Sequence, residues 1–300
     1  MTRRGLVLFG LMSIIWGIPY LLIRVAVAEI EPSVLVLART GIAALILLPI
    51  ALARVDLRPI LVRWRWVVVF ALVEVIVPWI LLSSAEQRLS SSLSGLLVSG
   101  VPLAGAVIAL VTRGERVSRT GLIGLLIGLV GVAAIVGGDF DVADTASLAA
   151  IGVVVIGYAL GPAVLARRLD GLSSVGIMGL SLGLAGLVYA PLGALQWPTR
   201  MPSPEVLVAV VILAVVCTAL AFNLFAVLIG EVGPIRATVV TYVNPAVAAI
   251  LGVVLLDERF TAPMAFGFGL VILGSALATR PTAPLPVPEP EAEAIEASLA

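Results

Sequence analysis

Two charged residues, Arg39 and Glu74, each interrupt an apolar stretch of the chain, and they are the residues best suited to chemistry. A charge at the centre of a bilayer costs roughly 2.5–3.5 kcal/mol on insertion scales, so each residue needs a partner or a water-filled cavity. An arginine and a glutamate on neighbouring helices can pair across such a cavity. The pair either responds to a substrate or a proton, or holds two helices together, and the sequence leaves both interpretations open.

A second group of polar residues lies on one face of a predicted helix over residues 237–256. Hydroxyls and a proline recur there at helical spacing, and an asparagine precedes the proline: Thr238, Thr241, Tyr242, Asn244 and Pro245. Ser99 and Pro102 form a sparser version in the segment 89–112. A proline removes a backbone hydrogen bond, so both segments are predicted to be broken helices around a central site. Helix packing is the alternative use of such small and hydroxyl residues.

Aromatic and amide side chains supply the remaining candidates for a substrate cavity. Trp16 and Tyr20 share one face of the first apolar segment, and Trp79 and Asn223 lie within two others. A ring or an amide at such a position can contact a substrate or pack against a neighbouring helix. No catalytic residue, metal site or cofactor is predicted, because the chain has no histidine and therefore no nucleophile–histidine pair.

The composition indicates a membrane protein. Apolar residues make up 61% of the chain and charged residues only 12%, and the mean hydropathy is +1.20. A soluble domain carries about 25% charged residues, so a soluble chain of this composition could not cover its surface. The formal net charge of zero disfavours a nucleic-acid partner, and the single cysteine, Cys217, excludes an intrachain disulfide.

Ten apolar segments are long enough to cross the hydrocarbon core, and each is predicted to be a helix because lipid offers no partner to free backbone groups. Eight of them are free of charge over 19 residues or more, and the other two contain Arg39 and Glu74. The predicted spans are 5–23, 33–53, 66–84, 89–112, 120–138, 145–166, 171–199, 206–230, 237–256 and 260–279. The predicted fold class is therefore an all-α, polytopic membrane protein.

The second half of the chain repeats the first at a fixed offset of 143 residues. The matched positions include Pro102 with Pro245, Glu115 with Glu258, and Arg116 with Arg259. The offset predicts two five-helix repeats over residues 1–142 and 143–280, followed by a disordered cytoplasmic tail, rich in Pro and Glu, over 281–300. Glycines recur at the same offset and predict close packing of the fifth and tenth helices: Gly124 and Gly131, then Gly267 and Gly274.

The distribution of arginines predicts how the chain is oriented. With the ten predicted spans, thirteen arginines fall on the side of the amino terminus and four on the opposite side. Because loops rich in arginine stay in the cytoplasm, both termini are predicted to be cytoplasmic. An odd number of helices per repeat then places the second repeat upside down relative to the first, which is the architecture of many secondary transporters.

These motifs resemble those of the drug/metabolite transporter superfamily, in particular its ten-helix EamA-type members. The resemblance covers residues 5–279 and is carried by Trp16-Gly17, Ala38-Arg39-Thr40-Gly41, Pro102 with Gly114-Glu115-Arg116, and Pro245 with Asp257-Glu258-Arg259. It implies a transporter of the bacterial cytoplasmic membrane that exports or exchanges small metabolites, such as amino acids or related compounds. The implied mechanism is alternating access at a central site between the repeats, without a cofactor. Protons are a candidate coupling ion, and the internal duplication favours a monomer.

The two repeats differ at the positions that matter most. The second repeat has Leu182 where the first has Arg39, and Cys217 where the first has Glu74. Cavity residues therefore cannot be transferred between repeats by symmetry. Two other functional classes remain as alternatives: a non-transporting membrane receptor or assembly protein, for which the short loops offer little surface, and an intramembrane enzyme, for which no catalytic motif is present.

Overall fold

The computed structural model describes residues 2–113, 119–137, 144–232 and 240–278, and every regular element in these ranges is a helix. The predicted all-α fold class is thereby confirmed. Thr238 and the predicted tail over 281–300 lie outside the described residues. So do Glu115 and Arg116 of the first-repeat motif.

Among the described residues, the first repeat consists of eight α-helices and one π-helix. In chain order they are α1 (Arg3–Ala26), α2 (Pro32–Arg54), α3 (Arg58–Val62), α4 (Trp64–Phe70), η1 (Ala71–Ile76), α5 (Val77–Ala85), α6 (Ser91–Val98), α7 (Val101–Arg113) and α8 (Arg119–Gly137). The short α3, which leads into α4, was not predicted from the sequence. It buries Ile60 and exposes Leu61 and Val62.

The second repeat follows the same order. Its described elements are α9 (Thr145–Arg168), α10 (Ser174–Leu195), α11 (Pro204–Ala214), η2 (Val215–Leu220), α12 (Ala221–Val232), α14 (Val240–Leu256) and α15 (Ala262–Ala278). Helix starts in both repeats follow from local sequence. Five of them begin after a residue whose side-chain oxygen accepts a backbone N–H of the first turn: Thr2, Ser90, Asp144, Ser173 and Ser203.

The predicted spans all have helices in the structure. Seven helical segments are long and apolar enough to cross a membrane: Arg3–Ala26, Pro32–Arg54, Trp64–Ala85, Ser91–Ile108, Thr145–Arg168, Ser174–Leu195 and Pro204–Leu228. Three shorter apolar helices correspond to the remaining predicted spans: Arg119–Ile135, Val243–Leu256 and Ala262–Leu277.

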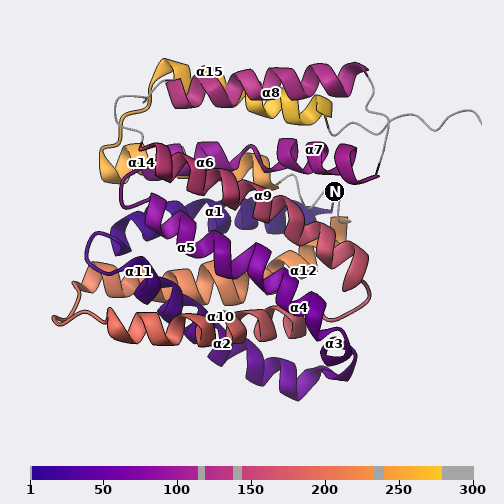
Figure 1. The fold of residues 1–300 in the computed structure, drawn as a ribbon, viewed down its shortest axis with the longest axis vertical. Helices are drawn as coiled ribbons and strands as arrows, with labels where there is room; N and C mark the ends of the chain where they lie inside the picture. Colours follow the sequence, from indigo (N-terminus) through magenta and orange to yellow (C-terminus); the bar gives the residue numbers. More distant parts are fainter. Residues whose placement is uncertain (1, 114–118, 138–143, 233–239, 279–300) are drawn as a thin grey trace, which may run out of the picture.

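Helices at equivalent positions of the two repeats pack against each other. α2 lies along α10, and α8 lies along α15 at the upper edge of Figure 1. α1 and its counterpart α9 run in opposite directions across the bundle (Figure 1), as an inverted repeat requires. Each of these two helices also packs into the other repeat, α1 against α11 and α14, and α9 against α5 and α7. The repeats therefore share one interior, and a site between them takes side chains from both.

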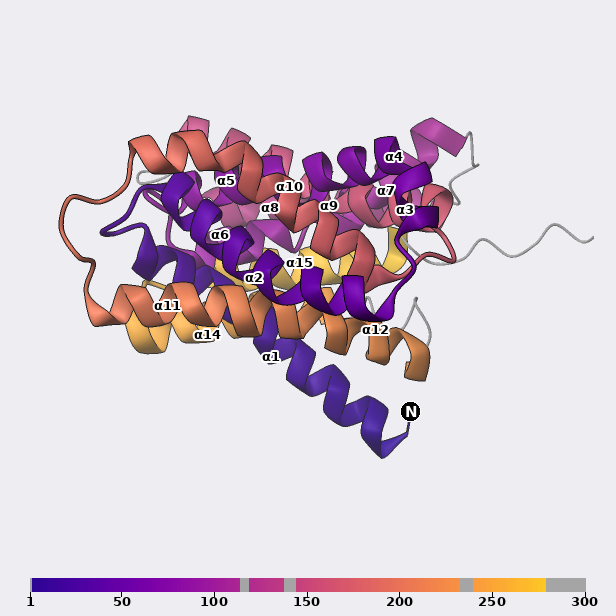
Figure 2. The same cartoon turned by 90° about the horizontal axis from the view of Figure 1, so that it is seen from below.

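The amino-terminal half of α1 diverges from the other helices when the bundle is seen from below (Figure 2). It is tied to the end of α12 by an ion pair between Arg4 and Glu231, whose nitrogen and oxygen are 3.2 Å apart. The Thr2 hydroxyl donates to the same carboxylate at 3.2 Å.

Two π-helical segments interrupt the third and eighth spans, where the sequence predicts continuous α-helix. η1 and η2 lie at nearly equivalent places, because the repeat offset maps Ala71 onto Ala214, one residue before η2 begins. A π-turn closes i→i+5 hydrogen bonds, so the side chains around it point in directions that an α-helix would not give. Such segments occur frequently at functional sites.

The predicted breaks at the two prolines have different outcomes. The fourth span is broken as predicted, with α6 ending at Val98 and α7 beginning at Val101, and Pro102 takes the second position of α7, where proline is tolerated. The prediction for Pro245 is wrong, because α14 continues through it from Val240 to Leu256. Proline is tolerated inside a membrane helix when neighbouring groups satisfy the freed backbone.

The predicted close packing of the fifth and tenth helices is confirmed. A methyl group built on Gly131 would lie 2.7 Å from the carbonyl oxygen of Gly267. One built on Gly274 would lie 2.6 Å from the carbonyl oxygen of Gly124. Only glycine allows the backbones of α8 and α15 to approach this closely, so these helices form a rigid scaffold beside the site.

Candidate functional site between the repeats

Arg39 of α2 is buried, and its guanidinium contacts groups from both repeats. Its Nε donates a hydrogen bond to Oγ1 of Thr218 in η2 at 3.0 Å, and its Cζ lies 3.7 Å from the centre of the Trp79 ring in α5. A cation over an aromatic face gains about 2 kcal/mol when both groups are desolvated. The Arg39 side chain is therefore fixed by one hydrogen bond and one ring, each from a different repeat.

The π-segment η2 orients the hydroxyl that holds Arg39. The Thr218 hydroxyl donates to the carbonyl of Leu213 at 2.7 Å, five residues earlier in the chain. This is the spacing of a π-turn, so the local departure from α-helix aims Oγ1 at Arg39. Thr218 is not among the residues predicted from the sequence. The indication in the sequence was that Thr218 follows Cys217, which is the counterpart of Glu74 in the second repeat.

Four polar side chains lie close enough to Arg39 to interact with it electrostatically: Tyr20, Tyr158, Cys217 and Glu86. Tyr20 comes from α1 and Tyr158 from α9, so four elements besides α2 surround the guanidinium: α1, α5, α9 and η2. Among the residues that the structure describes, Arg39 forms no ion pair within 4.0 Å. The charge of Arg39 is thus oriented but not neutralised by a carboxylate, which leaves it able to bind an anionic group.

The predicted pair between Arg39 and Glu74 is not formed, and this expectation is corrected. Glu74 lies on η1, which turns it toward α9, where its carboxylate packs against Gly161. Its Oε2 is buried, and no residue in the described ranges forms a hydrogen bond with it. The prediction assumed that residues 66–84 form a regular α-helix, and the π-segment moves Glu74 to another face.

Glu86 is a buried acid that the sequence analysis missed. It follows directly on the span Trp64–Ala85, its side chain is fully buried, and neither carboxylate oxygen has a hydrogen-bond partner among the described residues. Arg24 of α1 donates to the backbone carbonyl of Glu86 rather than to its carboxylate. Burial raises the pKa of the Glu86 carboxyl well above its usual range, and the nearby Glu258 carboxylate adds to this effect. The only signal in the sequence was an acidic residue directly after an apolar span.

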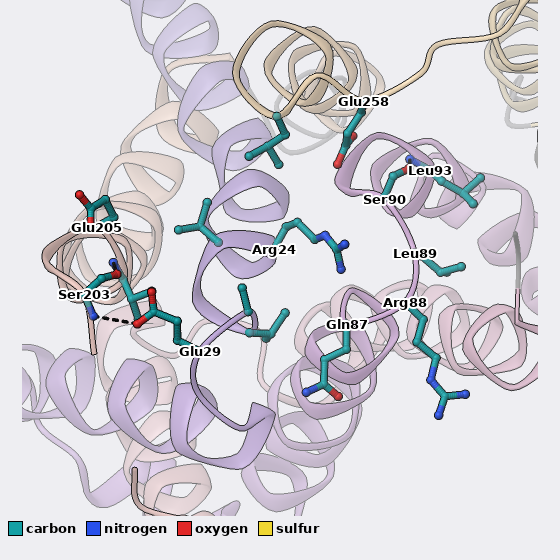
Figure 3. A pocket seen from close by; sticks show the side chains of 15 residues that line it. Arg24, Glu29, Gln87, Arg88, Leu89, Ser90, Leu93, Ser203, Glu205 and Glu258 are labelled. Atoms are coloured by element: carbon teal, nitrogen blue, oxygen red, sulfur yellow. Dashed lines mark hydrogen bonds between the residues drawn. The ribbon is translucent and has the colours of Figure 1, made fainter. Parts of the chain in front are cut away.

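A pocket of about 910 Å³ opens at the end of the bundle that is predicted to be external (Figure 3). It is lined mainly by the connections between helices: Arg24, Val25, Val27, Ala28, Glu29, Gln87, Arg88, Leu89, Ser90, Leu93, Ser203, Glu205, Val206, Leu256 and Glu258. Of the candidate residues that the structure describes, none lines this pocket. Gln87, which does, follows Glu86 in the chain, and Arg24, which also lines the pocket, donates to the backbone carbonyl of Glu86.

Charged groups in this pocket are held in place by hydrogen bonds. Glu29 accepts from the backbone N–H of Ser203 at 2.8 Å, and this bond lowers the pKa of the Glu29 carboxyl (Figure 3). Glu258 accepts from the backbone N–H groups of Ser91 and Ser92 at 2.7 and 2.8 Å. The Glu258 carboxylate therefore caps the start of α6, where the helix dipole favours a negative charge. The Asp-Glu-Arg motif thus has a structural role, connecting the end of α14 to the start of α6.

Two of the predicted aromatic candidates differ in their surroundings. Trp16 packs on α12, with its ring centre 4.6 Å from that of Phe225 and 5.7 Å from that of Phe222. Tyr20 is buried near Arg39 and also lies 3.6 Å from the position that a methyl group on Gly95 would take. The structure therefore groups Tyr20 and Trp79 with Arg39, whereas Trp16 contacts the rings of α12.

The remaining predicted residues are used within or between helices. Asn223 donates to the carbonyl of Ala219 at 2.7 Å, and the Asn244 amide nitrogen faces the carbonyls of Ser13 at 3.1 Å and Val240 at 2.9 Å. Ser99 is buried and donates to the carbonyl of Leu96 at 2.5 Å. Thr241 is half-buried in α14. Tyr242 belongs to the same helix, but its side chain, like all of Thr238, lies outside what the structure describes.

The fold and this site define a multi-pass membrane protein with a buried polar cluster between two repeats. The chain belongs to the EamA-like transporter family, whose model matches it twice, over residues 3–137 and 145–280. It is accordingly a membrane transporter of the drug/metabolite superfamily, and not an enzyme. Among the described residues, no group of three His, Cys, Asp or Glu side chains could hold a metal ion.

Several known proteins are similar over most of the chain. The uncharacterized inner membrane transporter YedA of Escherichia coli (strain K12) is 28% identical over 287 residues, which cover 92% of each chain. The uncharacterized transporter YvbV of Bacillus subtilis (strain 168) is 23% identical, covering 92% of this chain and 91% of the relative. The S-adenosylmethionine/S-adenosylhomocysteine transporter of Chlamydia trachomatis is 29% identical over 64% of this chain and 63% of its own. A solved crystal structure at 20% identity has the same fold, with a TM-score of 0.65 over 93% of this chain and 97% of its own.

Proposed function

We propose that this chain is a secondary transporter that exports or exchanges a small metabolite bearing a carboxylate, by alternating access at the Arg39 site. The proposal rests on the surroundings of the Arg39 side chain. Its guanidinium is buried between the repeats and oriented by Trp79 and Thr218, and no acidic partner lies within ion-pair distance among the described residues. A buried cation without a counter-ion is costly, so an anionic ligand group at this position is strongly favoured.

Alternating access is supported by how the repeats share the site. Arg39 and Trp79 belong to the first repeat, whereas Thr218 and Tyr158 belong to the second. Rocking of one repeat against the other would separate these groups and expose the site to one side of the membrane. The pocket of Figure 3 supports an external entrance, because it lies at the end of the bundle predicted to be external. Arg24, which lines it, also donates to the backbone carbonyl of Glu86.

The buried carboxyl groups support protons as the coupling ion. Within the described part of the chain, Glu86 has no hydrogen-bond partner for its carboxylate, and Glu74 has none for its Oε2. An ionised carboxylate in this condition is strongly disfavoured, so these groups bind protons when buried and release them when water enters. We place Glu86 first, because it interacts electrostatically with Arg39 and with Glu258, which lines the pocket.

The membrane and the orientation are also part of the proposal. The relative YedA is described as an inner membrane transporter, which supports the bacterial cytoplasmic membrane for this chain. The thirteen-to-four distribution of arginines supports cytoplasmic termini. Alkaline phosphatase fused after Ala300 is expected to be inactive in cells, and periplasmic phosphatase activity would contradict this orientation. The internal duplication supports a self-sufficient monomer.

Counterflow in proteoliposomes tests the proposed function. Liposomes containing the purified chain and a high concentration of an unlabelled amino acid or related carboxylate are diluted into a trace of the labelled compound. A transporter concentrates the label transiently in the lumen for its own substrates and not for others. One relative is named as a transporter of S-adenosylmethionine and S-adenosylhomocysteine, so these two compounds belong in the panel. Binding of a compound without any counterflow would indicate the alternative, a receptor.

A further inference from the structure

A cluster of arginine and tryptophan side chains lies at the end of the bundle opposite to the pocket. The cluster consists of Arg63, Trp64, Arg65, Trp66 and Arg168, and we call it the Arg–Trp patch. Its residues lie at the start of α4 and at the last residue of α9. These two helix termini lie side by side at the right of Figure 1. Trp64 is 56% exposed and Trp66 36% exposed, so the rings face the surroundings of the protein and not its core.

The guanidinium groups of this patch are positioned by rings and by one helix end. Arg168 lies over the Trp66 ring at 4.5 Å, and Arg65 over the Trp64 ring at 5.7 Å. Arg63 donates to the backbone carbonyls of Arg168 at 3.0 Å and Asp170 at 3.4 Å, which places its charge at the negative end of the α9 dipole. These contacts bring three positive charges of two different repeats to one place.

The charge of this region is not balanced by acidic side chains. Three more exposed arginines occur in the same connections: Arg54, Arg58 and Arg167. The acidic residues there are Asp56, which accepts from the backbone N–H of Arg58, and Asp170. Within the described part of the chain, none of the six arginines forms an ion pair within 4.0 Å. The patch therefore presents a positive surface with a place for external anions.

The apolar surroundings of the patch restrict what that anion can be. Leu61 and Val62 of α3 are 52% and 83% exposed beside the exposed tryptophans. Tryptophan rings in membrane proteins favour the level of the lipid headgroups, and aliphatic side chains next to them face acyl chains. A ligand with an anionic head and an apolar tail matches both parts, whereas a water-soluble anion matches only the arginines.

We propose that the Arg–Trp patch binds the headgroup phosphate of an anionic phospholipid of the cytoplasmic leaflet. Arg65 and Arg168 contact the phosphate from their ring-stacked positions, and the acyl chains lie along Leu61, Val62 and the tryptophans. Because Arg63 and Arg168 connect the first repeat to the second, the bound lipid bridges the two repeats at their cytoplasmic ends. The proposal does not depend on the substrate that the chain carries.

The test uses the full-length protein in nanodiscs of phosphatidylcholine, with and without phosphatidylglycerol. Native mass spectrometry measures retained lipid, and a thermal melt measures stability. We expect the wild-type chain to retain phosphatidylglycerol selectively and to melt at a higher temperature in its presence. Each arginine near an anionic lipid surface contributes about fivefold to affinity, so the Arg65→Gln/Arg168→Gln variant should bind roughly 25-fold more weakly. The matched control Arg200→Gln, an exposed arginine at the opposite end of the bundle, should behave like the wild type.

Three results would overturn the proposal. One is equal retention of phosphatidylglycerol by the double variant and the wild type. Another is a wild-type preference for phosphatidylcholine over phosphatidylglycerol. A third is full stabilisation of the detergent-solubilised protein by inorganic phosphate, which would assign the patch to a soluble anion. If the double variant fails to fold, the single variant Arg65→Gln replaces it in the comparison of lipid retention with the wild type. The Arg65 side chain is exposed and makes no hydrogen bond to the described backbone.

Discussion

Replacement of Arg39 by Gln is expected to abolish counterflow of the substrate while the protein remains folded. The guanidinium is a charged group that both repeats hold at the site, through Thr218 and Trp79. Removing one partner of a buried, hydrogen-bonded charge pair costs about 2–5 kcal/mol, so affinity for a carboxylate should fall roughly 30- to 4000-fold. Counterflow rates over a series of substrate concentrations measure this loss.

Two further variants separate binding from stability in this experiment. Arg39→Lys keeps the charge but loses the planar guanidinium that stacks on Trp79, so it should also transport poorly. Arg200→Gln removes an exposed arginine from the connection between α10 and α11 and should transport normally. The melting temperature of Arg39→Gln in detergent should be equal to or above that of the wild type, because an unpaired buried charge is removed. Normal counterflow by Arg39→Gln would exclude Arg39 as the group that binds substrate.

Replacement of Glu86 by Gln is expected to uncouple transport from the proton gradient. Gln keeps the shape of the side chain but cannot release a proton. Proteoliposomes with an imposed pH gradient should therefore lose accumulation of substrate above equilibrium, whereas exchange without a gradient continues. Glu205→Gln is the matched control, since Glu205 lines the same pocket but is exposed. Undiminished accumulation by a folded Glu86→Gln protein would contradict a role of Glu86 in coupling.

The stability of Glu86→Gln offers a check that needs no substrate. Burial raises the pKa of the Glu86 carboxyl in the folded state well above its usual range. A carboxyl with a raised folded-state pKa favours the folded state at pH values below its unfolded pKa, and this contribution is lost as the pH rises through the folded value. The wild type should therefore lose melting temperature, relative to Glu86→Gln, as the pH rises above 4.5. Parallel melting curves across pH would show that Glu86 does not titrate in the folded protein.

The architecture could be predicted from the sequence because hydrophobic runs, arginine distribution and a repeat offset are global features. Lipid leaves helices as the only option for apolar runs, and the offset of 143 residues relates the two repeats. The glycine positions also carried a direct physical meaning, since Gly131 and Gly274 allow a backbone approach that any side chain would block.

The site could be predicted only in part, because local backbone geometry decides where a side chain points. Arg39, Tyr20 and Trp79 were identified from residue type alone, and the structure brings them together. The Arg39–Glu74 pair was predicted by counting residues along regular α-helices, and η1 invalidates that count. Thr218 gained its role from the matching π-segment, for which the sequence has no simple signal.

Labelling of Cys217 tests most directly whether substrate binds between the repeats beside Arg39. It is the only cysteine of the chain, it is buried in η2, and it interacts electrostatically with Arg39, so the wild-type protein carries its own probe. A membrane-permeant maleimide should label Cys217 slowly as the repeats open, and Cys217→Ala should give no labelling. The proposed mechanism predicts that a transported substrate slows labelling, with half of the effect at the concentration that half-saturates counterflow. Labelling that stays unchanged while counterflow saturates would contradict a substrate site at this position.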